Sequence, residues 1–406
     1  MRYWGIRLRF NINIKILEMV PFVVISFGTF ATVLAYKGID FLYWLVFFLA
    51  VLALLLFKRH RLNLDISILM SLFFFNICML LISSIVFNTM PEDIIKALVH
   101  YFLPFSFGIL MISSRVKILA SYYDYWYFLL LVITFLAYVQ YFFSPTLWSL
   151  IPTESSKLFE YSENQPFTSY MLYFRATSIL GSPQVWAAFS ALSILALTAF
   201  REKKIGPFVL AFLWLGAFLS GGKIAVLIFI MYAFYIFRAS FINTLYLATF
   251  FLTGYLLYIF FFEFELPRII EHVTGLTRIF EEEEDGRLSI WAKIYSDMNW
   301  FLGGGPSYIN NLDSKTNLVA ESYILQTWVE LTIIFPLTFI YLIVRQVYYY
   351  HDSLIHIIFY GAVLVSTISS HAFSHPIFIV MWPFLVNHCI NKSSYETNKV
   401  KKGSLI

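Results

Sequence analysis

Long apolar runs separated by short polar segments dominate the chain. About twelve of these runs approach the ~20 residues that a helix needs to cross a bilayer. Their residues are apolar all round, whereas a membrane β-barrel alternates apolar and polar residues over segments of ~10. The pattern therefore predicts an all-α, polytopic helix bundle that forms a single membrane domain over residues 1–406. The expected spans are 19–36, 39–57, 64–87, 94–112, 122–143, 179–200, 205–220, 224–237, 241–262, 320–344, 354–370 and 374–391.

Composition excludes most other classes of protein. The 406 residues are 60% hydrophobic and 13% charged, against roughly 45–50% and ~25% in soluble domains. Disorder, a disulfide scaffold and nucleic-acid binding do not fit this composition. Cys78 and Cys389 both lie in apolar runs, which predicts two buried thiols and no metal site built from them.

The distribution of Lys and Arg predicts the orientation of the spans, because cytoplasmic loops carry an excess of both. With the N-terminus in the cytoplasm, every cytoplasmic connection holds at least one basic residue, and both termini are cytoplasmic. Two connections are long, 144–178 and 263–319, and both fall outside. The cytoplasmic connections have no room for a nucleotide-binding domain. Any chemistry is therefore expected at the outer face or within the membrane.

Several basic residues lie on the predicted outer side, although Lys and Arg are generally in excess in cytoplasmic loops. Arg175 and Lys223 border apolar segments, where a charge without a partner is costly. A lipid headgroup, a carboxylate or a pyrophosphate would be such a partner, and a guanidinium suits phosphate because it donates two parallel hydrogen bonds. The alternative is a set of solvated loop charges. The outer basic residues include Arg175, Lys223, Arg268, Arg278, Arg287 and Lys293.

The second outer loop predicts an amphipathic helix near 287–302, since Leu288, Trp291, Met298 and Phe301 recur at helical spacing. Gly303–Pro306 is a strong stop signal after it. Such a helix would lie on the membrane surface or pack over the bundle.

Acidic residues flank this helix in the sequence. The run Glu281–Asp285 could bind a divalent cation, but a solvated loop is the expectation, so no metal site is predicted. Glu321 lies at the outer mouth of a span, and Glu330 lies nine residues further on. An ionisable residue inside a membrane is by default a candidate for function. For Glu330 the alternative is a carboxyl neutralised by protonation or by hydrogen bonds within the bundle.

These residues together resemble a known signature. The order Arg287, Trp291, Gly303–Gly305, Glu321–Tyr323 and Glu330 is similar to the signature region of the bacterial O-antigen polymerase and ligase superfamily. Members of that superfamily are multi-spanning inner-membrane glycosyltransferases with a large periplasmic loop late in the chain.

Two earlier segments resemble further motifs of the same superfamily. One is Arg175 followed by Gly181–Gln184, and the other is the turn Ser220–Lys223. The resemblance covers roughly residues 175 to 335, and the first five predicted helices agree with it in layout only.

The resemblance implies a reaction and a set of site residues. The donor would be a glycan on undecaprenyl pyrophosphate, in the inner membrane with the active site facing the periplasm. Glu321 would be the base for the acceptor hydroxyl, and Arg287 would stabilise negative charge on the leaving pyrophosphate. The resemblance implies no cofactor and no metal, since basic side chains would carry the phosphate charge. Residues implied in substrate binding are Arg175, Lys223, Arg278, Tyr323 and Glu330.

Three functions stay open at this point. Ligases of the superfamily usually have a histidine where this chain has Glu321, which favours the polymerase. The nearest alternative is an O-antigen ligase that transfers the glycan to lipid A-core. A lipid-linked oligosaccharide flippase would instead line a cavity with charged residues, and the candidates for that are few: Lys96, Asp124 and Glu330. Partners expected from the pathway include a flippase and a chain-length regulator.

Overall fold

The structure is a computed structural model of the chain. It describes residues 14–36, 39, 41–57, 64–113, 117–143, 176, 178–180, 182–201, 203–220, 222–239, 249, 294, 298–306, 308, 322–370 and 372–386. Within these residues every regular element is a helix, and the one bridge of strand type joins Asn299 to Gly303. The all-α prediction is thereby confirmed.

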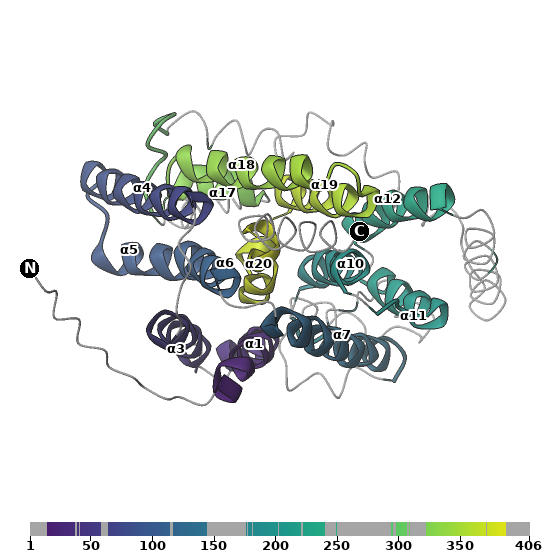
Figure 1. Ribbon diagram of the computed structural model, residues 1–406. Helices are drawn as coiled ribbons and strands as arrows, with labels where there is room; N and C mark the ends of the chain where they lie inside the picture. The colour runs from purple at the N-terminus through teal and green to yellow at the C-terminus, as the bar shows by residue number, and fades with distance from the viewer. Residues whose placement is uncertain are drawn as a thin grey trace, which may run out of the picture.

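The described helices follow the apolar runs of the sequence (Figure 1). The first half contains α1 (Ile14–Thr29), α2 (Ala31–Tyr36), α3 (Phe41–Phe57), α4 (Leu64–Val86), α5 (Pro91–Ala97), the π-helical turn η1 (Leu98–Phe102), α6 (Leu103–Ser113) and α7 (Lys117–Phe143). The second half contains η3 (Ser178–Leu180), α10 (Pro183–Phe200), α11 (Pro207–Phe218), α12 (Lys223–Ala239), α17 (Tyr323–Glu330), α18 (Ile334–Tyr349), α19 (Leu354–Ser369), η5 (Ala372–Ser374), η6 (Pro376–Met381) and α20 (Trp382–Val386).

Four stretches of helix are long and apolar enough to cross a membrane. They are Ser67–Val86, Pro91–Met111, Tyr122–Tyr141 and Pro183–Phe200. Shorter apolar helices accompany them. These helices fit an integral membrane protein, whereas the number of twelve spans and their orientation stay predictions.

Large apolar side chains also cover the outside of the bundle. Phe48 on α3, Ile85 on α4 and Phe234 on α12 are all exposed. Exposed apolar surface of this extent fits contact with lipid, because proteins that fold in water rarely expose so much apolar surface. Cys78 lies on the same outward face of α4 and is exposed. Its predicted burial was wrong, because a helix at the outside of the bundle directs some of its apolar residues outward. Cys389 lies outside the described residues.

An irregular helix forms the centre of the bundle. Figure 1 shows α20 between α6 and α10, with α18 and α19 passing over it. The η6–α20 segment is almost completely buried. It contains Pro376 and Pro383, and a proline removes a backbone donor and disturbs the regular ladder of hydrogen bonds.

Three side chains from surrounding helices bond to the carbonyls of this central segment. Tyr122 on α7 donates to Val380 O at 2.6 Å, Tyr360 on α19 to Phe384 O at 2.8 Å and Gln346 Nε2 on α18 to Leu385 O at 2.9 Å. Unpaired carbonyls are expensive in an apolar interior. The surrounding side chains therefore stabilise the irregular backbone.

The predicted span 320–344 differs from the structure, which has two helices there. Helix α17 ends at Glu330, and α18 begins at Ile334. In a continuous helix the ring of Pro336 would clash with the carbonyl of residue 332. The chain breaks just before that point, and Phe335 N donates to Thr332 O at 3.3 Å in a tighter turn.

The helix termini gather at two ends of the bundle. One end, here called the Tyr323 end, joins the start of α17 to the end of α19 through Tyr323 N and Ser370 O at 3.1 Å. The other, called the Asp124 end, joins α7 to the segment after α10 through Asp124 and Arg201.

Candidate functional site

Ser322 fixes the start of α17 at the Tyr323 end. Its hydroxyl accepts a hydrogen bond from Leu325 N at 3.3 Å and donates one to Thr367 O at 3.3 Å. The serine thus caps one of the free amides of the first helical turn. Together with the bond from Tyr323 N to Ser370 O at 3.1 Å, it ties α17 to the end of α19.

Tyr323 is buried among aromatic rings. Its ring lies 6.2 Å from that of Tyr101 and 5.7 Å from those of Phe339 and Phe373, measured between centroids. The side chain is 2% exposed. Tyr323 therefore forms part of the wall behind the Tyr323 end.

Glu330 is the one acidic or basic residue with a buried side chain among the residues that the structure describes. Its Oε2 accepts a hydrogen bond from the hydroxyl of Tyr101 at 2.6 Å. A short bond to a carboxyl group is among the stronger hydrogen bonds in proteins. The contact matches the alternative raised from the sequence, in which a hydrogen bond within the bundle stabilises Glu330.

Tyr101 was not identified from the sequence. It is buried and lies in the π-helical turn η1, between α5 and α6, and it contacts a residue 229 positions away. The only signal for it was a tyrosine within a predicted span, and the chain has 27 tyrosines. Neither its partner nor the π-turn follows from an apolar pattern.

The glycine-rich segment predicted as a stop signal packs against the end of α17. Gly304 N donates to Val329 O at 2.8 Å, and Ile333 N donates to Phe301 O at 3.2 Å. Gly303 has a φ of +72°, and a Cβ built on it would lie 2.5 Å from Val329 O. Only glycine combines that backbone conformation with so close an approach.

This segment also contacts the end of α4. Ser83 Oγ donates to Leu302 O at 2.9 Å. The turn that precedes Gly303 is closed by Asn299, whose side-chain oxygen accepts from Phe301 N and Leu302 N, both at 2.9 Å. Of the predicted amphipathic helix near 287–302, most residues lie outside the described part of the chain, and residues 299–302 form this turn.

Two other motif segments meet elsewhere at the Tyr323 end. Ala176 N donates to Leu219 O at 2.9 Å, which joins the residue after Arg175 to the beginning of the Ser220–Lys223 turn. Within that turn Gly222 N donates to Ser220 Oγ at 3.1 Å. A Cβ on Gly222 would lie 2.5 Å from that of Ala187 on α10, so the turn sits tightly on α10.

Lys223 follows this turn as the first residue of α12, and its side chain is exposed. The remaining predicted site residues lie outside the described part of the chain. Those residues are Arg175, Arg278, Arg287 and Glu321. The structure therefore brings together Tyr323 and Glu330, and it places Lys223 beside the motif segment that contains Ala176.

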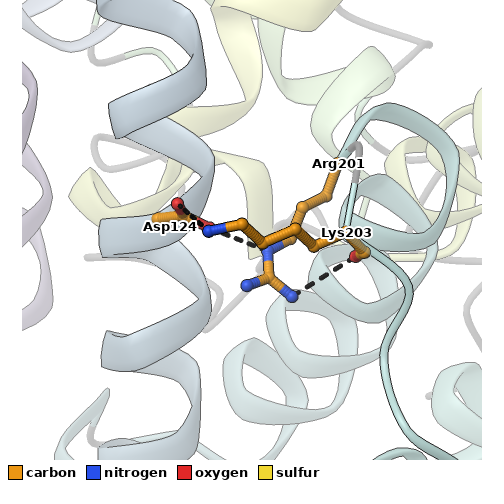
Figure 2. Close-up of polar contacts among 3 residues, drawn as sticks. All are labelled: Asp124, Arg201 and Lys203. Atoms are coloured by element: carbon orange, nitrogen blue, oxygen red, sulfur yellow. Dashed lines mark hydrogen bonds and ion pairs between the residues drawn. The ribbon is translucent and has the colours of Figure 1, made fainter.

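The Asp124 end carries a different polar cluster (Figure 2). Asp124 on α7 accepts from Arg201 Nε at 3.0 Å and lies 3.5 Å from Lys203 Nζ. Arg201 also donates to the carbonyl oxygen of Lys203 at 3.4 Å, and its guanidinium lies 4.1 Å from the centre of the Tyr127 ring. Asp124 and Lys203 are both well exposed. This is a surface ion cluster that joins two helix ends.

The charged residues considered for a transport pathway each have a partner. Lys96 Nζ lies 3.5 Å from Asp93 Oδ1, Asp124 pairs with Arg201, and Glu330 bonds to Tyr101. Within the described part of the chain, no three or more potential metal ligands lie together.

Comparison with known proteins leaves the resemblance as a prediction. No protein-family model, no curated protein and no solved structure matches this chain.

Proposed function

We propose that the protein is a membrane glycosyltransferase of the O-antigen polymerase type. It transfers a glycan from a polyprenyl-pyrophosphate donor to a sugar hydroxyl of a lipid-linked repeat unit. The reaction takes place at the outer face of the inner membrane. The chain crosses that membrane about twelve times and has both termini in the cytoplasm. The Tyr323 end is the outer end.

One observation carries the proposal. The segments that resemble the superfamily motifs lie far apart in the sequence, yet they contact one another in pairs at the same end of the bundle. Gly303–Gly305 packs on α17, and Ala176 bonds to Leu219 beside the Ser220–Lys223 turn. Loops positioned by a rigid scaffold are the common location of catalytic residues.

The chemistry assigns a role to each predicted residue. The acceptor oxygen attacks the anomeric carbon, the bond from that carbon to the pyrophosphate oxygen breaks, and Glu321 takes the hydroxyl proton. Negative charge grows on the leaving pyrophosphate, and fixed cations lower the barrier where such charge develops. Those cations are Arg175, Lys223, Arg278 and Arg287. Tyr323 and Glu330 form the wall of the site on α17.

The partners follow from the reaction. The substrates are undecaprenyl-pyrophosphate-linked oligosaccharides held in the bilayer, and a flippase of the same pathway delivers them to the outer leaflet. A chain-length regulator is a further partner of the polymerase. The transfer needs no redox or group-carrying cofactor, because the donor is already activated as a pyrophosphate ester.

Deletion of the gene, followed by a gel of surface polysaccharide, tests the proposal. A polymerase mutant shows lipid core that carries a single repeat unit. A ligase mutant shows bare core while polymer collects on the carrier. A flippase mutant shows bare core and no polymer. Either of the last two patterns would exclude the polymerase.

A further inference from the structure

Glu330 lies at the point where three parts of the molecule meet. It ends α17, it bonds across to the long span Pro91–Met111 through Tyr101, and it follows Val329, whose carbonyl binds the glycine-rich segment. Its side chain is 8% exposed. The carboxyl group is thus directed into the bundle, and its partners are the hydroxyl group of Tyr101 and the side chain of Gln326.

The π-helical turn accounts for the position of Tyr101. Successive residues of an α-helix are rotated by about 100°, and a π-turn holds an extra residue, so the faces of α5 and α6 are offset by about that angle. Single π-turns within α-helices occur frequently at functional sites. Here the turn covers Leu98–Phe102, and the hydroxyl of Tyr101 lies 2.6 Å from Glu330 Oε2.

Helix α17 is held in place by several tertiary contacts, among them the bond from Trp328 Nε1 to Trp300 O at 2.9 Å. It is eight residues long, and the chain breaks directly after it. Its first turn is held by Ser322 and Ser370, and its last turn by Gly304 and Tyr101. A short helix of this kind depends on tertiary contacts for its stability.

We infer that Tyr101 is a positioning residue of the transferase site, acting through its hydrogen bond to Glu330. The bond holds α17 against the span Pro91–Met111, and so fixes the Ser322–Tyr323 start of the helix, next to Glu321 in the sequence. The inference rests on the proposed function and refines the role of Glu330. Its carboxyl acts as a hydrogen-bond acceptor for Tyr101 and not as a charge that binds substrate.

The test combines amide hydrogen exchange with polymerisation, using the full chain in lipid nanodiscs and a purified lipid-linked repeat unit. Tyr101→Phe removes one hydroxyl group and keeps the ring. We expect exchange of the α17 amides to accelerate and kcat to fall, each by about tenfold, which corresponds to the loss of one hydrogen bond worth about 1.4 kcal/mol. We expect KM to stay within about twofold, because ground-state binding is unchanged.

Tyr122→Phe is the matched control. Tyr122 is also fully buried and also donates one bond of 2.6 Å, but to Val380 O on the central segment. It should accelerate exchange in the η6–α20 segment and leave α17 and kcat at wild-type values. Equal effects of the two variants on kcat would reduce Tyr101 to a packing residue and overturn the inference.

Substitutions at Glu330 separate the hydrogen bond from the charge. Glu330→Gln keeps an acceptor oxygen, so we expect kcat within about threefold of wild type. Glu330→Leu removes the acceptor of both Tyr101 and Gln326 and should lose at least as much as Tyr101→Phe. The double variant Tyr101→Phe with Glu330→Leu should be no worse than Glu330→Leu alone, since Glu330→Leu already removes the contact that Tyr101→Phe removes. A Gln variant as inactive as the Leu variant would overturn the inference. Absence of polymerisation by the wild-type protein would sink the proposed function instead, and amide exchange would still decide whether Tyr101 holds α17.

Discussion

The two ends of the bundle handle charge in opposite ways. At the Asp124 end, Asp124 and Lys203 are exposed and paired with each other at the surface. At the Tyr323 end, Glu330 is buried and hydrogen-bonded to the neutral side chains of Tyr101 and Gln326, while Lys223 is exposed at the start of α12. An exposed pair contributes ~0–1 kcal/mol, whereas a buried polar group that loses its partner costs ~1–3 kcal/mol.

This difference indicates which end has a specific task. The surface ion cluster joins the start of α7 to the segment after α10 and needs no burial of charge. A buried carboxyl is expensive to retain in an apolar bundle. It sits beside a glycine segment that tolerates no other residue at Gly303. We therefore expect substitutions at the Tyr323 end to reduce the transfer reaction and substitutions at the Asp124 end to leave it unchanged.

The largest effect is expected from Glu321→Gln. Removal of the proposed base should reduce the rate of transfer by about 10²–10⁴-fold, the usual contribution of a general base. The change is isosteric, so membrane insertion and expression should be unaffected. Polysaccharide chain length in cells, and turnover of a lipid-linked repeat unit, measure the effect. Normal chain length in this variant would contradict the role of Glu321.

Arg287→Ala, compared with Arg268→Ala, should give the next largest effect. Both residues lie in the second predicted outer loop, but only Arg287 belongs to the motif. Loss of one group that stabilises developing charge lowers kcat by about 10²–10³-fold, and Arg268→Ala should stay within a few-fold of wild type. The measurement is kcat for polymerisation in proteoliposomes. Equal losses in the two variants would mean that the site is misplaced.

Gly303→Ala, compared with Gly206→Ala, probes the backbone at the two ends. At Gly303 an added Cβ would meet Val329 O at 2.5 Å at a φ of +72°. The expected loss is about 2–4 kcal/mol from left-handed strain and the clash. Gly206, at the Asp124 end, has a φ of −66° and open space around its Cβ position, so stability should change by less than about 1 kcal/mol.

Thermal unfolding in detergent compares these two glycine variants. A Gly303→Ala protein as stable as Gly206→Ala would show that the glycine segment does not pack on α17 as described.

Asp124→Asn should have the smallest effect. The change removes the charge that faces Arg201 and Lys203, and the pairs are partly solvated. We expect a loss below about 1 kcal/mol, smaller still at high salt, with polymerisation unchanged. Thermal unfolding at low and high ionic strength measures it. A loss of polymerisation in this variant would contradict the conclusion that only the Tyr323 end takes part in the reaction.

The apolar pattern predicted the positions of most helices. The expected spans 64–87 and 354–370 agree closely with α4 and α19. In these runs continuous apolar character and length suffice to predict a helix, since a helix that crosses a bilayer needs ~20 mostly apolar residues. The pattern also gave Gly303–Gly305 as a breaking point, because glycine at positive φ ends regular structure.

The details of the site could not be predicted in the same way. The break after Glu330 depends on Pro336 and on the glycine segment that bonds to Val329. A mean hydropathy taken over a whole span does not register either of these local features. The contact of Tyr101 with Glu330 joins residues 229 positions apart. Such a contact requires the register of two helices, and one π-turn shifts that register without a signal in the sequence.

The central position of α20 has a consequence for the order of assembly. Membrane helices are synthesised in sequence order, at about 5–20 residues per second. The helices that surround Pro376–Val386 are all made before it. The bonds to its carbonyls from Tyr122, Gln346 and Tyr360 therefore form only after this segment has been synthesised. The bundle can therefore close around this central segment only after all the helices that surround it have been made.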